Sequence, residues 1–138
     1  MDKNTVLNYF KDFSKINRCS KHEEKISDYL ENFANNNSLE CKRDKFNNIY
    51  IKRESDKSLE DKPGIILQAH MDMVCVSDED YDFNDGIKIM EKDGFMFADK
   101  TSLGADNGIG LAIAMATLTS NYKLPQIEAV VTLSLIHI

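Results

Sequence analysis

The sequence predicts an α/β fold in which helices flank a mixed central sheet. The first 35 residues carry apolar side chains at helical spacing, which is typical of amphipathic helices packed on a core. Residues 65–67 form a compact apolar run that predicts a strand. A segment from Asp106 to about Ser120 is apolar nearly all round, which predicts a buried helix. A largely buried sheet covered by helices is the simplest arrangement for these elements.

Two amphipathic helices are expected in the N-terminal part of the chain. The apolar stripe of the first contains Val6, Tyr9, Phe10, Phe13 and Ile16. The stripe of the second contains Ile26, Leu30, Phe33 and Ala34. Between them, residues 20–23 have the form of a capping box, with Ser20 as the N-cap and Glu23 reaching back to it. His22 lies on the polar side of this helix start, so we expect it to be solvated.

Short strands are expected on both sides of the apolar run at 65–67. These strands are residues 39–43, 49–52, 87–90, 95–98 and 127–132. The pair Asp93-Gly94 separates two of them and predicts a two-strand hairpin. The apolar run at residues 65–67 leads to His70, and it predicts a strand buried on both faces.

The composition restricts the class of protein. A chain of 138 residues can form one domain with a core, and 42% hydrophobic and 29% charged residues favour a globular fold over disorder. The net charge of −6 disfavours nucleic acid as a partner, because binding it depends on neutralising phosphates. No apolar stretch approaches the ~18 residues of a membrane span, and no secretion signal opens the sequence.

The cysteines indicate the compartment. Cys19, Cys41 and Cys75 are odd in number and include no close pair, so we expect free thiols rather than a disulfide framework. Free thiols are typical of a reducing environment, which predicts a cytoplasmic location.

Two motifs carry the candidate chemistry. His70 and Asp72 lie two positions apart at the end of the apolar run, where alternation in a strand gives them the same face. Asp106 lies in a glycine-rich turn that opens the apolar helix. A neutral imidazole and carboxylates are the ligands of zinc-type hydrolytic sites, and a carboxylate can bridge two metal ions. One His and one Asp cannot complete such a site, so further donors are required.

Other interpretations of the same residues exist. His70 can be a satisfied core histidine with Asp72 as a strand-end aspartate, and Asp106 can be a helix N-cap. A phosphate-binding loop is disfavoured, because the spacing of Gly104, Gly108 and Gly110 does not match the dinucleotide motif and no Gly-Lys-Ser/Thr follows.

Residues 68–75 (QAHMDMVC) and 101–110 (TSLGADNGIG) resemble the aminoacyl-histidine dipeptidases, or Xaa-His dipeptidases. These belong to the aminoacylase/carboxypeptidase group of di-zinc metallopeptidases. The similarity includes residues 26–30 and 48–51 and extends to Thr132. The resemblance therefore implies that residues 1–132 are the N-terminal portion of a di-zinc exopeptidase catalytic domain.

The resemblance implies a role for each motif residue. His70 would ligate one zinc, Asp106 would bridge two zinc ions, and Asp72 would be the catalytic aspartate that supports His70. A cis peptide bond would follow Asp106. The implied reaction is hydrolysis of small dipeptides that end in histidine, assisted by a glutamate base, with other divalent metals possible. The resemblance also implies that the full-length parent is a homodimer, joined through a lid domain.

The sequence departs from this pattern after Thr132. The family's general-base glutamate and a glutamate ligand should fall near positions 134–136, but residues 133–138 contain no carboxylate side chain. These last residues resemble the translation of a sequencing-library adapter, which predicts a non-native tail at 133–138 on a truncated gene without the lid domain. On this hypothesis the chain alone is inactive and His137 is not a ligand. The alternatives are another dipeptidase, exopeptidase or deacylase of the family, or a non-catalytic binding protein that retains the fold.

Overall fold

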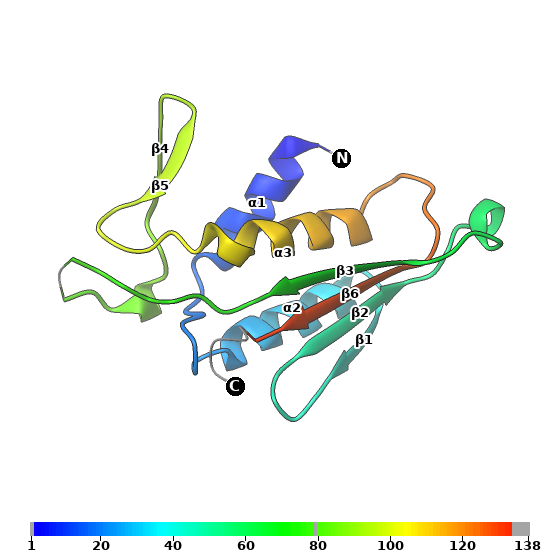
Figure 1. Ribbon diagram of the computed structural model, residues 1–138, viewed down its shortest axis with the longest axis horizontal. Coiled ribbons are helices and arrows are strands. Elements are labelled where there is room, and N and C mark those ends of the chain that lie inside the picture. The colour runs from blue at the N-terminus through cyan, green and yellow to red at the C-terminus, as the bar shows by residue number, and fades with distance from the viewer. Residues whose placement is uncertain (1, 79, 134–138) are drawn as a thin grey trace.

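The computed structural model describes residues 2–78 and 80–133, which form a mixed α/β structure as predicted (Figure 1). Two short 3-10 helices, Lys57–Leu59 and Phe83–Asp85, lie in connecting loops. The helices are α1 (Lys3–Phe13), α2 (Glu24–Asn36) and α3 (Ala105–Leu118). The strands are β1 (Glu40–Arg43), β2 (Ile49–Arg53), β3 (Ile65–His70), β4 (Ile89–Lys92), β5 (Phe95–Ala98) and β6 (Ile127–Thr132).

The four-stranded sheet is mixed and has the order β1-β2-β6-β3. Strand β6 pairs antiparallel with β2 and parallel with β3, so the last strand of the chain lies between two earlier ones. The parallel register places His70 opposite Thr132. The carboxyl ends of β3 and β6 therefore lie side by side at one end of the sheet, and the carboxyl ends of strands are where ligands bind in open α/β sheets.

Strands β4 and β5 form a separate hairpin that extends away from the main sheet (Figure 1). Both turn residues have positive φ, 53° at Asp93 and 81° at Gly94. Two positive φ angles are the requirement of the tight hairpin turn that Asp-Gly favours. The hairpin predicted from this pair is confirmed.

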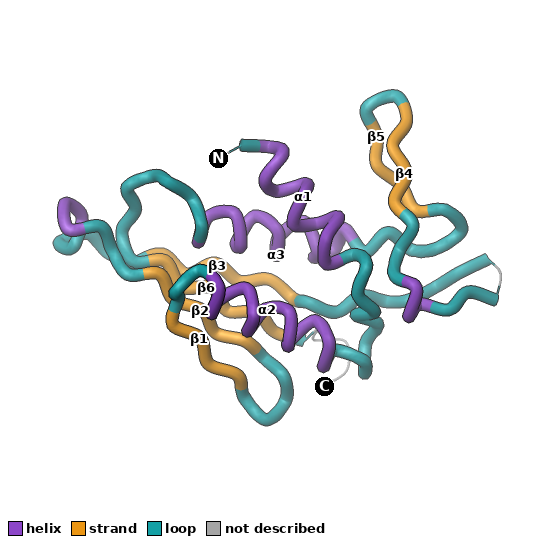
Figure 2. The backbone as a smooth tube through the Cα atoms, turned by 180° about the vertical axis from the view of Figure 1, so that it is seen from behind, coloured by secondary structure: helices purple, strands orange, loops and turns teal. Residues whose placement is uncertain are grey.

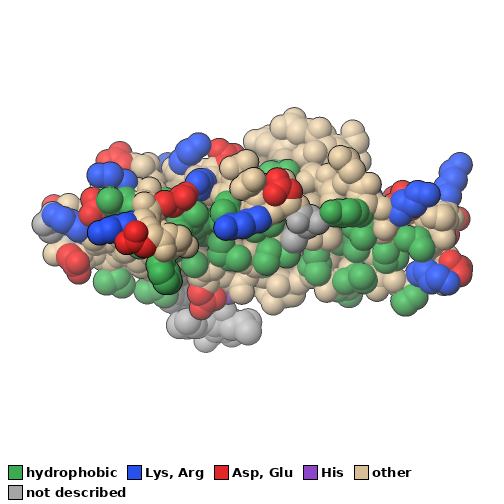
Figure 3. Space-filling view, turned by 90° about the horizontal axis from the view of Figure 1, so that it is seen from above, with side chains coloured by type: hydrophobic (Ala, Val, Ile, Leu, Met, Phe, Trp, Pro, Cys, Tyr) green, Lys and Arg blue, Asp and Glu red, His purple; other side chains and the backbone are tan. Residues whose placement is uncertain are grey.

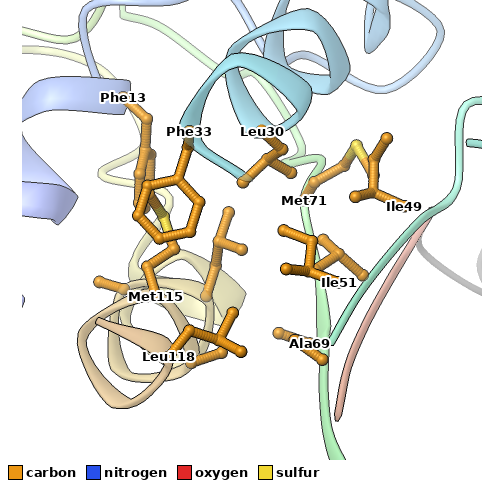
Figure 4. Close-up of a cluster of buried hydrophobic side chains, with 14 of the residues drawn as sticks. Phe13, Leu30, Phe33, Ile49, Ile51, Ala69, Met71, Met115 and Leu118 are labelled. Atoms are coloured by element: carbon orange, nitrogen blue, oxygen red, sulfur yellow. The ribbon is translucent and has the colours of Figure 1, made fainter. Parts of the chain in front are cut away.

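The hydrophobic core lies between the helices and one face of the sheet (Figure 4). Alternate residues of β2 and β6, such as Ile51 and Ala129, are buried there, and Phe13, Leu30 and Met115 reach them from the three helices. From behind, α2 is seen to lie across the strands, while α1 packs on α3 (Figure 2). The apolar stripes predicted for the first two helices are thus confirmed as core.

Strand β3 differs from its prediction. It lies at the edge of the sheet with β6 on one side only, and Ile65 and Ile66 are 47% and 66% exposed. The prediction of burial on both faces is wrong for these residues, because an apolar run reveals that a surface is apolar but not which elements cover it. Alternation along β3 puts Ile66, Gln68 and His70 on the face opposite the core.

The surface carries charges of both signs. Figure 3 shows acidic and basic side chains interspersed with hydrophobic ones on the face seen from above, without one large basic area. In the part of the chain that the structure describes, no helix has the length and apolar character needed to cross a membrane.

Candidate metal site at the carboxyl end of strand β3

The two predicted motifs meet at the end of β3. This strand delivers His70, and α3 begins so that Asp106 lies at its first turn. His70 Nε2 is 3.3 Å from Asp106 Oδ1, although the residues are 36 positions apart. The side chain of Asp106 is 94% exposed and that of His70 is 25% exposed, so both are accessible to a ligand.

The hydrogen bonds of His70 define its tautomer. Its Nδ1 lies 2.9 Å from the backbone oxygen of Asp72 and 3.4 Å from the Asp72 carboxylate. A carbonyl oxygen only accepts, so Nδ1 carries a proton and donates to it. Nε2 of the neutral ring then has a lone pair directed at the Asp106 carboxylate. Two facing acceptors of this kind need either a second proton on the ring or a cation between them.

Asp72 lies inside the protein and is 1% exposed. The Ser20 hydroxyl donates to its Oδ2 at 2.6 Å. This contact corrects the predicted capping box: α2 begins at Glu24 with Glu23 as its N-cap, and the Glu23 carboxylate accepts from the backbone N–H of Lys21 instead. Ser20 is turned away from the helix because a buried carboxylate needs a donor. The exposed His22 is confirmed as a surface residue.

Arg18 is a residue of the site region to which the sequence analysis assigned no role. Its side chain is 1% exposed and donates to the backbone oxygens of Met71 and Gly104. Burial lowers the pKa of Arg18 to about 10, and the negative charge of Asp72 opposes part of this effect. The available indication was a charged residue two positions after the apolar stripe of the first helix.

The start of α3 has the backbone that the resemblance implied. The peptide bond between Asp106 and Asn107 is cis, and the backbone of both residues departs from helical angles. Gly104 is the N-cap, with φ of +71° and no side-chain cap. Because Asp106 and Asn107 are not helical, the regular part of α3 begins after them, and Asp106 lies at the break just before it.

The cysteines also differ from the prediction. Cys19 and Cys75 form a disulfide with 5.4 Å between their Cα atoms, while Cys41 is free. The expectation of three free thiols is wrong because backbone pairing at Cys19 and Met73 brings the two segments together, and sequence spacing cannot show this. Burial raises the pKa of the Cys41 thiol, and Glu31 adds to this effect.

The site opens to solvent through a pocket of about 270 Å³. Its lining consists of His70, Asp72, Met73, Val74, Ser102, Gly104 and Asp106. Within residues 2–78 and 80–133, no group of three or more His, Cys, Asp or Glu side chains could hold a metal ion. His70 and Asp106 thus supply donors of the type zinc prefers but not a full coordination shell. Positions 134–136, where the family's glutamates were expected, lie outside the described residues.

Fold and site together define a mixed α/β domain with His70 and Asp106 gathered at the carboxyl end of β3. The structure superposes on aminoacylhistidine dipeptidase from Vibrio alginolyticus with a TM-score of 0.91 and 34% identity, over 99% of this chain and 29% of that one. A tripeptidase from Staphylococcus aureus superposes with a TM-score of 0.79 and 25% identity, over 96% and 37% of the two chains.

Sequence comparison agrees with the structural match. The cytosol non-specific dipeptidase of Escherichia coli strain K12 is 37% identical over 102 residues, which are 72% of this chain and 21% of that protein. No protein-family model matches the sequence. The chain belongs to the aminoacyl-histidine dipeptidase family and spans less than a third of the length of these dipeptidases.

Proposed function

We propose that this chain carries one side of a two-zinc dipeptidase site. The parent protein would hydrolyse dipeptides in the cytoplasm, with a preference for those that end in histidine. The observation that carries the proposal is the approach of His70 Nε2 to Asp106 Oδ1, which are 3.3 Å apart in an open pocket. The family membership of the chain and the name of the cytosolic Escherichia coli relative support it.

Each residue contributes through its own position. His70 would bind one ion through Nε2, because its Nδ1 proton is engaged by the Asp72 carbonyl. Asp106 would bridge both ions, since its exposed carboxylate can offer one oxygen to each. Asp72 would hold the His70 ring in place and is itself held by Ser20. When bound, zinc would polarise the scissile carbonyl and make a water molecule a stronger nucleophile.

The chain by itself would not catalyse the reaction. The described residues place no glutamate beside His70 and Asp106 that could act as a general base, and two donors cannot hold two zinc ions firmly. We therefore propose that hydrolysis needs residues beyond those in this sequence. A protein made from the complete open reading frame of the genomic locus should be active, whereas the 138-residue chain should not be.

Zinc titration tests the site. Calorimetry on the complete protein should give two zinc ions per chain, and His70→Ala or Asp106→Asn should weaken binding at least tenfold. His22→Ala is the matched control, because His22 is an exposed histidine away from the pocket. Equal zinc affinity in the His70 variant and the His22 variant would contradict the proposed ligand.

A second candidate is a peptidase of the same family with a wider substrate range. It is favoured by the names of two relatives, one a non-specific dipeptidase and the other a tripeptidase. Rates on dipeptides with and without C-terminal histidine, and on tripeptides, separate the two candidates. Tight zinc binding without hydrolysis of any of these would instead indicate a binding protein.

A further inference from the structure

We infer that Arg18 is a positioning residue that fixes the distance between the segments carrying Asp72 and Asp106. The inference rests on the proposed function for its consequence but on the geometry of the chain for its mechanism. Arg18 lies in the connection between α1 and α2, outside both motifs that were identified in the sequence.

The guanidinium bonds to both site segments at once. Nη1 donates to the Met71 carbonyl at 3.0 Å, directly before Asp72, and Nη2 donates to the Gly104 carbonyl at 2.5 Å, two residues before Asp106. The two nitrogens belong to one planar group, so their separation is fixed by covalent geometry. A single side chain therefore sets the spacing of two segments that are far apart in sequence.

The backbone around Arg18 is anchored to the same segment. The Met73 N–H donates to the Arg18 carbonyl at 3.0 Å, and the Ser20 N–H donates to the Met73 carbonyl at 3.0 Å. The backbone of Arg18 is thus held against the segment that carries Asp72, while its guanidinium reaches across to the segment that carries Asp106. Its remaining face packs on the Phe13 ring, 5.4 Å from the centroid.

The glycines at the start of α3 fit this role. A Cβ atom at Gly104 would lie 2.4 Å from Arg18 Nη2, and one at Gly108 would lie 2.8 Å from the same atom. A Cβ atom at either glycine would therefore crowd the guanidinium, and the one at Gly108 would also lie 2.8 Å from Phe10 Cε2. The glycine-rich turn thus leaves room for a buried cation.

Burial of the Arg18 charge costs free energy unless hydrogen bonds to the guanidinium offset it. Arg18 is 1% exposed, and its Nε has no hydrogen-bond partner in the described structure. Apolar packing alone would be served better by an apolar side chain, since burying a charge carries a large desolvation penalty. The two carbonyl contacts and the nearby charge of Asp72 offset that penalty.

The test compares Arg18→Met with Ile51→Ala. Methionine keeps an unbranched stem and removes both donors, while Ile51 lies in the core, away from the pocket, and serves as a control for lost stability. Hydrogen exchange is measured at residues 71–75 and 102–108 in the metal-free 138-residue chain. Zinc affinity is measured on the complete protein by competition with a chromophoric chelator.

Arg18→Met should speed exchange at least tenfold in both segments and weaken zinc binding at least tenfold. Ile51→Ala should change exchange and zinc affinity only as far as it changes global unfolding. Arg18→Lys should give exchange rates and zinc affinities between those of wild type and Arg18→Met, because one ammonium cannot span both carbonyls. Equal exchange in Arg18→Met and Ile51→Ala would overturn the inference. If Arg18→Met fails to fold, exchange in Arg18→Lys decides, and wild-type rates there would overturn it. If wild type binds no zinc, the proposed function fails, while exchange still decides the role of Arg18.

Discussion

Replacing Gly104 by alanine should destabilise the protein far more than the same change at another glycine with positive φ. Gly104 has φ of +71°, and an added Cβ would lie 2.4 Å from Arg18 Nη2 and 2.6 Å from Met73 Sδ. Gly94 has φ of +81°, but nothing lies within 4 Å of its added Cβ. Gly94→Ala therefore reports the backbone strain alone.

The magnitude follows from two contributions. A left-handed conformation costs a non-glycine residue roughly 1–2 kcal/mol. Displacing the Arg18 guanidinium from the Gly104 carbonyl would cost about 2 kcal/mol more, since hydrogen bonds to charged groups are worth roughly 1.5–3 kcal/mol. We expect about 3–4 kcal/mol for Gly104→Ala and about 1–2 kcal/mol for Gly94→Ala.

Urea unfolding followed by far-ultraviolet circular dichroism measures both variants, and the midpoints are compared at a common slope. Equal losses at the two positions would refute the reasoning, because they would show that Arg18 and Met73 do not fill the space at Gly104.

Three further predictions address the fold. Ile51→Ala should cost about 2–5 kcal/mol in urea unfolding, whereas Ile66→Ala on the uncovered face of β3 should stay within about 0.5 kcal/mol, and similar losses would contradict the assignment of faces. Alkylation followed by mass spectrometry should find one modified thiol in the oxidised chain and three after reduction. Reduction should lower the free energy of unfolding by about 4 kcal/mol, because the Cys19–Cys75 bond closes a separation of 56 residues. Glu40 accepts hydrogen bonds from Lys52, which has the larger effect, and from Lys42, and these bonds lower the pKa of Glu40 to about 2. The ionised Glu40 therefore stabilises the fold fully above about pH 4.3, and this stabilisation is lost as the pH falls toward 2. A carboxyl NMR titration of Glu40 with a midpoint above pH 4 would contradict that pairing.

Local patterns predicted the elements of this fold because each rests on its own residues. The stripes of α1 and α2, the Asp93-Gly94 turn and the apolar α3 all appear where periodicity and turn chemistry place them. His70 and Asp106 were identified as candidate ligands from the same kind of evidence, and the structure brings them to 3.3 Å.

The remaining features depend on contacts between distant segments. Ser20 satisfies the helix-cap pattern, yet its hydroxyl donates to Asp72, because the buried carboxylate is the more demanding acceptor. The strand-like pairing of Cys19 with Met73 brings Cys19 within disulfide distance of Cys75, and no spacing rule reveals this. The exposure of Ile66 depends on which elements neighbour β3. These are properties of the tertiary arrangement rather than of local sequence.

The most direct test of the zinc site is anomalous diffraction at the zinc edge from crystals of the complete protein grown with zinc. We predict a peak in contact with both His70 Nε2 and the Asp106 carboxylate, and its loss in the His70→Ala protein. Zinc bound elsewhere, with His70 still hydrogen-bonded directly to Asp106, would contradict the proposed metal site.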